Sequence, residues 1–346
     1  MSPIARNPPV FDLSRIPDPR VLAGTPEVSY RDPAALLVDG EVRLWFTENH
    51  ALAEGGMQSH VSEIRSRDLV AWTAPRPITV PGDPANWSSP GNVVREGREW
   101  VMCLQTYPTP PGGYIGDDSC RIYTARSRDL ESWDEAELLQ VKGNHVSEEA
   151  MGRMIDPYLL QDKDDPGLWW CFYKQNGASI SRSRDLRQWE YVGRTECGEN
   201  VSALIRDDEY LLMHSPGADG MGLLATADLR QFRELAPNRI QLGHRVWPWA
   251  RRRLTAGTVL DLRAEPGIGK YLMFYHGSAE LPGMHEHVSA SSLGLAWSND
   301  LLNWEWPGGW PPTAQRRVVL HRAAPDADQL PAFTVLQGNH AKPETR

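Results

Sequence analysis

Ser66-Arg67-Asp68-Leu69, followed by Trp72, is the first of five copies of one short phrase in this chain. In every copy a Ser or Thr stands two residues before the Asp, a Leu follows the Asp, and an aromatic residue stands four residues after it. Sequence repeats separated by 43 to 72 residues are typical of solenoids, arrays and propellers. The remaining copies are Ser127-Arg128-Asp129-Leu130 with Trp133, Ser183-Arg184-Asp185-Leu186 with Trp189, Thr226-Ala227-Asp228-Leu229 with Phe232, and Ser298-Asn299-Asp300-Leu301 with Trp304.

The residues around each phrase predict β-strands. A strand precedes each copy, and a hairpin lies further upstream. The clearest hairpins pair predicted strands 34–38 with 42–46, 92–94 with 100–104, and 203–205 with 210–213. Each phrase then forms the turn into a fourth strand, because Asp and Ser side chains can cap their own backbone. We expect the aromatic residue of each phrase to pack between neighbouring sheets.

These units predict an all-β fold, a five-bladed β-propeller with four antiparallel strands per blade. The predicted blades are approximately 30–80, 87–140, 153–195, 199–240 and 254–310, within one domain that spans residues 1–346. The termini are rich in Pro and irregular, and we expect part of one terminus to supply a strand that closes the ring.

Composition excludes several classes of function. The formal net charge of −9 argues against nucleic-acid binding, which needs a basic face. The chain has no run of 18 apolar residues and no apolar stretch near Met1, which predicts a cytoplasmic protein without membrane association. The four cysteines lack zinc-finger spacing and are expected to be free and buried, as in a reducing compartment. Oligomeric state is left open.

The first residues of the five innermost strands line the central funnel of such a propeller, and three of these segments carry a carboxylate. The segments are Tyr30-Arg31-Asp32-Pro33, Trp87-Ser88-Ser89-Pro90, Arg153-Met154-Ile155-Asp156-Pro157, Glu196-Cys197-Gly198-Glu199-Asn200 and Leu254-Thr255-Ala256-Gly257-Thr258.

This ordered set resembles the five-bladed glycoside hydrolases, chiefly family 43 and more distantly families 32 and 68, over about residues 30–307. The resemblance implies that Asp32 is the general base, that Asp156 orients the acid and tunes its pKa, and that Glu199 is the general acid. Cleavage of a glycosidic bond needs one carboxylic acid to protonate the leaving oxygen and one carboxylate on the opposite side of the sugar. The acid needs a raised pKa, which a neighbouring carboxylate provides. Glu196 is the alternative acid, because the Glu-Cys pair is similar to the acid motif of family 32. The spacing from Glu199 to Ser215 is similar to that of the strand pair carrying the acid in family 43, and favours Glu199.

Further residues are candidates for binding the substrate. Trp87 stacks on a sugar face in one interpretation and packs between blades in the other. Glu48-Asn49-His50 either bonds hydroxyl groups or forms a plain loop, and Arg251-Arg252-Arg253 is either a solvated run or reaches an anionic or sugar ligand. The remaining candidates for substrate binding are Arg31, Arg153, Glu196, His214 and His276. The two histidines are either ligands near the axis or neutral core histidines with satisfied hydrogen bonds.

No metal site and no cofactor is predicted. His285-Glu286-His287 has two imidazoles only two residues apart on a loop, which is poor evidence for a metal site, and no calcium loop signature is present.

The expected function is a glycosidase that cleaves a small oligosaccharide or glycoside of the furanoside or pentoside type, with inversion. The alternatives are a retaining fructosidase-like or phosphorolytic enzyme, and a non-catalytic propeller that binds carbohydrate or protein. The sugar, the linkage and exo or endo action stay open.

Overall fold

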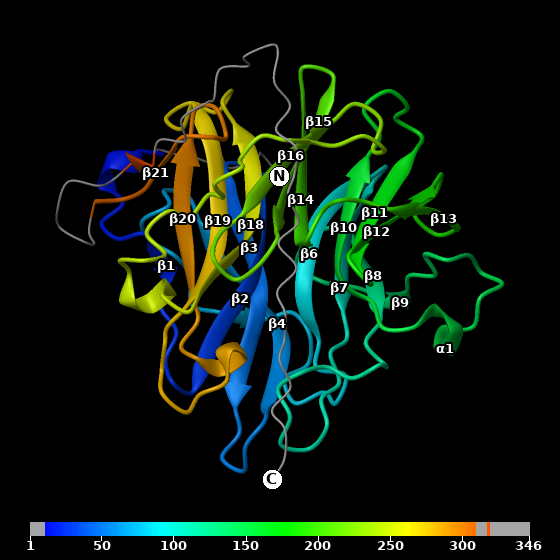
Figure 1. Cartoon of the computed structure of the whole chain (residues 1–346), viewed down its shortest axis with the longest axis horizontal. Helices are drawn as coiled ribbons and strands as arrows, with labels where there is room; N and C mark the ends of the chain where they lie inside the picture. Colours follow the sequence, from blue (N-terminus) through cyan, green and yellow to red (C-terminus); the bar gives the residue numbers. More distant parts are fainter. Residues whose placement is uncertain (1–10, 309–316, 319–346) are drawn as a thin grey trace, which may run out of the picture.

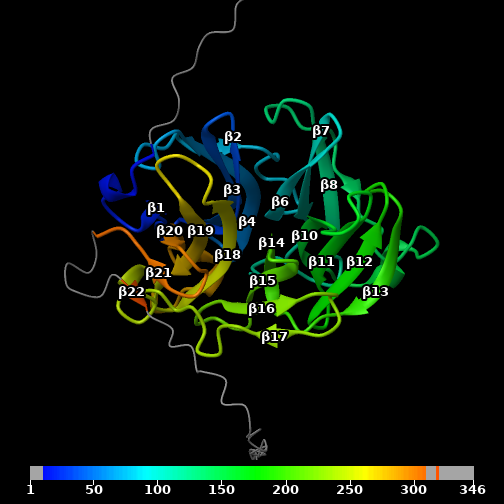
Figure 2. The same cartoon turned by 90° about the horizontal axis from the view of Figure 1, so that it is seen from above.

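The fold is an all-β, five-bladed β-propeller. The structure is a computed structural model, and it describes residues 11–308 and 317–318. Figure 2 shows the sheets arranged around a central axis. The first strands of the five sheets contact one another in a closed ring, in the order β2, β6, β10, β14 and β18. The blades are β2 (Val28–Val38), β3 (Glu41–Ala51), β4 (Met57–Ser66), β5 (Arg76–Pro77); β6 (Ser88–Glu96), β7 (Glu99–Gln105), β8 (Ile122–Ser127), β9 (Glu137–Leu138); β10 (Ile155–Gln161), β11 (Trp169–Lys174), β12 (Ala178–Ser183), β13 (Trp189–Arg194); β14 (Glu199–Arg206), β15 (Glu209–Ser215), β16 (Gly222–Thr226), β17 (Arg233–Glu234); and β18 (Arg253–Leu262), β19 (Lys270–Ser278), β20 (Ser292–Ser298), β21 (Trp304–Glu305).

The repeated phrase makes the same turn in all five blades, as the sequence predicts. In the first copy Asp68 Oδ1 accepts the N–H groups of Val70 and Ala71 at 2.9 and 2.8 Å. The equivalent Asp makes the same two bonds in the other four copies. The Leu of each phrase has a positive φ, between 53° and 69°, which the capped turn stabilises.

Five apolar clusters hold neighbouring blades together, and each contains or contacts the aromatic residue of one phrase. Trp133 of the second blade meets Trp45 of the first edge to face, with ring centroids 6.3 Å apart. Trp72 meets Phe274 of the fifth blade in the same way at 6.0 Å. The prediction that these aromatics pack between sheets is therefore confirmed. The four cysteines are free and buried, as expected.

The N-terminal segment joins the last blade. Strand β1 (Arg20–Leu22) pairs antiparallel with β20, and β2 of the first blade follows it along the chain (Figure 1). A further strand, β22 (Arg317–Val318), pairs with β21. The predicted fifth blade runs to residue 310, and residues 309–310 lie outside the described part of the chain.

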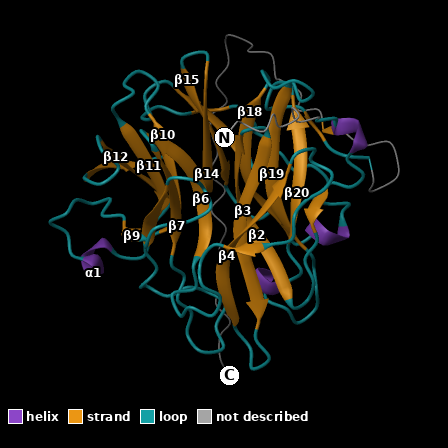
Figure 3. Cartoon of the chain, turned by 180° about the vertical axis from the view of Figure 1, so that it is seen from behind, coloured by secondary structure: helices purple, strands orange, loops and turns teal. Residues whose placement is uncertain are grey.

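Helical segments are short (Figure 3): η1 (Leu13–Arg15), α1 (Glu148–Met151), η2 (Pro248–Ala250) and η3 (Glu286–Val288). Among the described residues, none of the helices has the length and apolar character needed to cross a membrane.

Candidate active site

A bulge interrupts each innermost strand near its start, and it places the candidate catalytic residues. The pairing register with the second strand shifts once in every blade, between Arg31 and Ala34 in the first and at the equivalent places elsewhere. One residue at each bulge has a positive φ, between 44° and 56°: Asp32, Ser89, Asp156, Asn200 and Ala256. Bulges re-aim side chains and are frequent next to active sites. Here they turn the two Asp-Pro segments towards the axis in equivalent ways.

Most of the bulges are tied to the neighbouring blade by one hydrogen bond. In four cases a side chain near the end of the second strand of one blade accepts a hydrogen bond. The donor is the backbone N–H of the positive-φ bulge residue in the next blade of the ring. The bonds are Ser89 N–H to Thr47 Oγ1 (2.8 Å), Asp156 N–H to Gln105 Oε1 (2.6 Å), Ala256 N–H to Ser215 Oγ (2.9 Å) and Asp32 N–H to His276 Nδ1 (3.1 Å). The equivalent position in the third blade is Lys174, whose side chain instead meets Glu199 of the fourth blade.

All three predicted catalytic carboxylates line one cavity of about 240 Å³. Asp32, Asp156 and Glu199 come from the first, third and fourth blades. Four cationic side chains line the same cavity, together with a fourth acid and several hydrogen-bonding groups. The charged lining residues are Arg31, Arg153, Lys174, Arg253, Asp32, Asp156, Glu199 and Glu286.

Asp32 is fixed on both its backbone and its side chain. Its Oδ2 accepts the Thr47 hydroxyl at 3.2 Å, and its N–H donates to His276 Nδ1. Burial raises the pKa of Asp32, while Arg31 and the Thr47 hydroxyl act in the opposite direction. Arg31, Arg253 and the Thr47 hydroxyl therefore stabilise its charged form, but burial outweighs them and the pKa stays above its usual value.

His276 supports Asp32 from behind. Since its Nδ1 accepts the Asp32 N–H, the neutral ring carries its proton on Nε2, which lies 3.1 Å from Thr255 Oγ1. Burial, with the charge of Arg31 next in size, holds the pKa of His276 well below its usual value. The structure thus makes the predicted binding residue His276 a neutral, hydrogen-bonded support that does not line the cavity.

Asp156 is the carboxyl group with the most strongly raised pKa at this site. Its Oδ1 accepts the Ser89 hydroxyl at 2.9 Å. Burial raises the pKa of Asp156 to about 7, and the negative charges of Glu199 and Asp32 add to the effect. Asp156 therefore holds a proton over the acidic pH range.

Glu199 lies between two cations. Lys174 Nζ donates to its Oε2, and Arg253 Nη1 donates to its Oε1 at 3.2 Å. Burial raises the pKa of Glu199, but Lys174 and Arg253 outweigh it, so that the pKa lies below its usual value. The expectation that Asp156 would raise the pKa of Glu199 is not met in this structure, because the two cations hold the charge of Glu199 while Asp156 takes the proton.

Two of the other predicted binding residues line the cavity. Arg31 is buried, and its Nη1 donates to the Glu286 carbonyl oxygen at 3.1 Å. Arg153 bonds the Gly116 carbonyl through Nε at 3.2 Å, and its guanidinium lies 5.6 Å from the centre of the Tyr107 ring. Both arginines present positive charge to a ligand in the cavity.

Three predicted binding residues lie elsewhere. Trp87 meets Tyr123 edge to face, and its indole N–H donates to Asp83 Oδ2 at 3.0 Å, so it packs in the wall between the first two blades. Glu196 is exposed and does not line the cavity. His214 is buried, and its Nδ1 accepts the Gly198 N–H at 2.8 Å, which fixes the turn before Glu199.

Sequence reasoning missed Lys174 and Glu286 as residues of the cavity and left Arg253 undecided. Arg253 begins β18 and donates to Glu199 and to Glu286, at 3.2 Å to Glu286 Oε1. Lys174 ends β11, opposite Ile155, and it is equivalent by repeat to Thr47 and Gln105. The repeat register is the signal that would have placed Lys174 in the site.

Comparisons with known proteins find the likeness in structure alone. The sequence matches no protein-family model, and it matches no curated protein. The fold is similar to that of family 43 and family 62 glycoside hydrolases. A family 43 β-xylosidase/α-arabinofuranosidase from a compost microbial metagenome, in complex with xylotriose, is 13% identical, with 82% of this chain and 96% of that chain covered and a TM-score of 0.56.

Two further structures show the same likeness. The α-L-arabinofuranosidase of Podospora anserina, in complex with cellotriose, is 15% identical, covers 85% of this chain and 95% of its own, and gives a TM-score of 0.55. A family 43 enzyme from Xanthomonas citri is 12% identical, with 86% of this chain and 97% of that chain covered and a TM-score of 0.56. At these identities the similarity establishes the five-bladed fold.

Proposed function

We propose that this protein is a glycoside hydrolase that cleaves a small oligosaccharide or glycoside of the furanoside or pentoside type. The observation that carries the proposal is the meeting of Asp32, Asp156 and Glu199 in one cavity on the propeller axis. The cavity volume of about 240 Å³ suits one or two sugar rings, and its wall is rich in hydrogen-bonding groups. Solved propellers of the same fold, in complex with xylotriose and cellotriose, support this substrate class.

In the proposed reaction Glu199 protonates the leaving oxygen and Asp32 activates a water on the opposite face of the sugar. Thr47 and His276 hold Asp32 in place through its side chain and its backbone N–H. Asp32 and Glu199 belong to blades separated by the fifth blade on one side and by two blades on the other. This placement favours the wider separation of about 6.5–9.5 Å that inverting glycosidases need.

Asp156 is the source of the proton that Glu199 needs for this step. The two carboxyl groups repel each other's charge, so the pair titrates as a unit and holds one proton below a pH of about 7. In this structure Lys174 and Arg253 keep the charge on Glu199. Sugar hydroxyl groups that accept hydrogen bonds from Lys174 and Arg253 would weaken the ion pairs of these cations with Glu199. The pKa of Glu199 would then rise, and the proton would move to it.

The cations also favour a second candidate, phosphorolytic cleavage. Lys174, Arg253 and Arg153 line one cavity and present positive charge to it. Arg and Lys side chains are the usual protein partners of phosphate oxygens. In that reaction inorganic phosphate would replace water as the attacking group.

A panel of nitrophenyl furanosides and pyranosides, assayed with and without inorganic phosphate, tests both candidates. We expect release of nitrophenol from a pentofuranoside or pentopyranoside without phosphate. Activity should fall by about 10²–10⁴-fold in Asp32→Asn on the nitrophenyl glycoside, and in Glu199→Gln on an alkyl glycoside of the same sugar. The exposed Glu196→Gln is the matched control and should keep wild-type activity. Full activity in both cavity variants would refute the assignment, and a strict need for phosphate would move the protein to the second candidate.

A further inference from the structure

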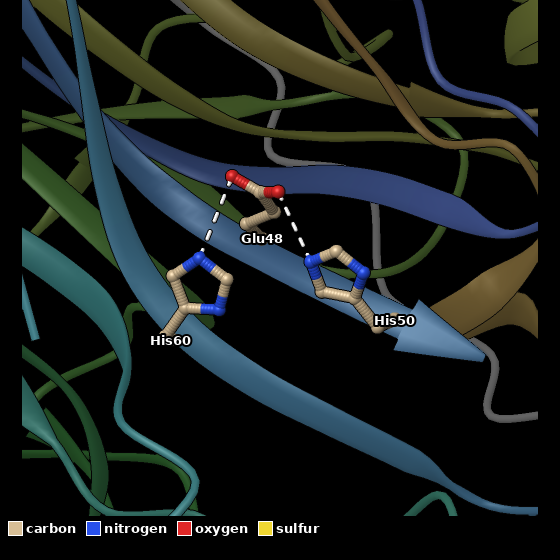
Figure 4. A group of neighbouring side chains, drawn as sticks. All are labelled: Glu48, His50 and His60. Carbon is tan, nitrogen blue, oxygen red and sulfur yellow. Dashed lines mark hydrogen bonds and ion pairs between the residues drawn. The ribbon is translucent and has the colours of Figure 1, made fainter. Parts of the chain in front are cut away.

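A second cluster of chemically reactive side chains lies outside the proposed catalytic set, on the long hairpin of the first blade. Glu48 and His50 lie on β3, and His60 lies on β4 directly across from Glu48. Side chains two apart on a strand share a face, as do directly opposed residues, so all three project from the same face of the hairpin. Figure 4 shows the Glu48 carboxylate between the two imidazoles, with one oxygen towards each ring.

The three groups are close enough to share one ion. Glu48 Oε1 lies 3.0 Å from His50 Nε2, and Oε2 lies 3.6 Å from His60 Nε2. The imidazole rings are stacked, with centroids 5.4 Å apart and planes 15° apart. One ligand atom from each residue lies within 4.8 Å of the other two.

Burial makes this cluster a partly formed site with an open side. The His60 side chain is 6% exposed and that of Glu48 13%, so these two are held by their surroundings. The His50 side chain is 41% exposed, and it leaves a path from solvent to the carboxylate. A ligand set with two fixed members and one movable member can close around an ion with a small rotation of His50.

We propose that Glu48, His50 and His60 bind a divalent transition-metal ion, with Zn²⁺ as the preferred occupant. Two imidazoles and one carboxylate are a frequent three-ligand set for zinc, with water as the fourth ligand. Zn–N and Zn–O distances of about 2.0–2.2 Å around one centre place ligand atoms about 3.3 Å apart, close to the 3.0 and 3.6 Å of the two carboxylate contacts. Ca²⁺ and Mg²⁺ prefer all-oxygen sites, so two imidazoles select against them.

Binding here would stiffen one wall of the catalytic cavity. Asn49 and Ser59 alternate with the ligand residues along β3 and β4, and both line the cavity. Asn49 Nδ2 also donates to the His287 carbonyl oxygen at 2.9 Å, which ties the end of β3 to η3. An ion that joins β3 to β4 therefore fixes the position of this wall without touching the three catalytic carboxylates.

Isothermal titration of the full-length, chelator-treated protein with zinc sulfate tests the proposal. We expect one ion per chain, an increase in Tm on zinc addition, and visible d–d absorption of four-coordinate Co²⁺ when cobalt replaces zinc. His50→Gln, at a half-exposed position, should weaken zinc binding at least tenfold and abolish the increase in Tm. Glu48→Gln should weaken zinc binding in the same way.

Two control variants identify the site. His145→Gln changes an exposed histidine between the second and third blades and should leave zinc affinity unchanged. His285→Gln disrupts the other close histidine pair, His285 and His287, whose ring centroids lie 4.9 Å apart at the cavity. Unchanged zinc affinity in His50→Gln, or a loss of affinity in His285→Gln instead, would overturn the proposal.

Discussion

Asp156→Asn should stabilise the protein, and the gain should grow as the pH rises. In the folded protein burial and the charges of Glu199 and Asp32 raise the pKa of Asp156 to about 7, from an ordinary value of 3.8. The folded state therefore keeps a proton that the unfolded state has lost, and the free energy of unfolding falls as the pH rises between these two values. Asn is nearly isosteric with the protonated acid and accepts the positive φ of 53° at this position.

The size of this effect follows from the shift in pKa. One unit of pKa is worth 1.36 kcal/mol, so the charged form of Asp156 costs the folded state about 4 kcal/mol once the pH exceeds 7. Because part of that cost is already present at pH 5, the advantage of Asp156→Asn over the wild type should increase by about 3 kcal/mol between pH 5 and pH 8. This cost disappears from the wild type as the pH falls well below 3.8, where Asp156 is protonated in both the folded and the unfolded state.

Urea denaturation of the wild type and Asp156→Asn at several pH values measures this difference directly. Asp118→Asn, at an exposed loop position, is the control and should follow the wild type at every pH. A difference between Asp156→Asn and the wild type that stays constant from pH 5 to pH 8 would refute the reasoning, because it would mean that Asp156 is ionised across that range.

Three further predictions follow from the same geometry. Lys174→Met removes a cation that lowers the pKa of Glu199, so the basic limb of the pH profile of kcat/KM should move to higher pH. An unchanged basic limb would mean that Lys174 does not affect the pKa of the catalytic acid. The first-formed sugar anomer, observed by proton NMR, should have the inverted configuration, whereas retention would point to a glycosyl ester on Asp32. Trp304→Ala should lower the free energy of unfolding by about 3–5 kcal/mol in urea, since its fully buried side chain joins the fourth and fifth blades; a cost below 1 kcal/mol would contradict that packing.

The repeat made the fold predictable from the sequence. Each phrase carries its own turn chemistry, in which the Asp caps two backbone N–H groups, so the blade count does not depend on distant contacts. The same register places Asp32 and Asp156 at equivalent bulges, because both precede a Pro at the start of an innermost strand. Glu199 lies one residue before its bulge residue, Asn200, and it reaches the same cavity by a different route.

Contacts between blades were harder to predict. Lys174 ends an apolar strand, where a lysine would be expected to face solvent, and only the neighbouring blade shows that it meets Glu199. Trp87 is beside the site in sequence, but Asp83 and Tyr123 hold its indole in the wall. The neighbouring carboxyl group of Asp156 predicts a raised pKa for Glu199. Two cations instead lower the pKa of Glu199, so that Asp156 carries the raised pKa.

The dependence of activity on the leaving group tests the assignment of Glu199 and Asp32 most directly. For Glu199→Gln, kcat/KM should fall by about 10²–10⁴-fold on an alkyl glycoside, whose leaving oxygen needs a proton, and should change little on a dinitrophenyl glycoside of the same sugar. For Asp32→Asn, kcat/KM should fall by a similar factor on both substrates, because activation of water is needed in each case. Equal losses on the two substrates in Glu199→Gln would contradict its role as the general acid.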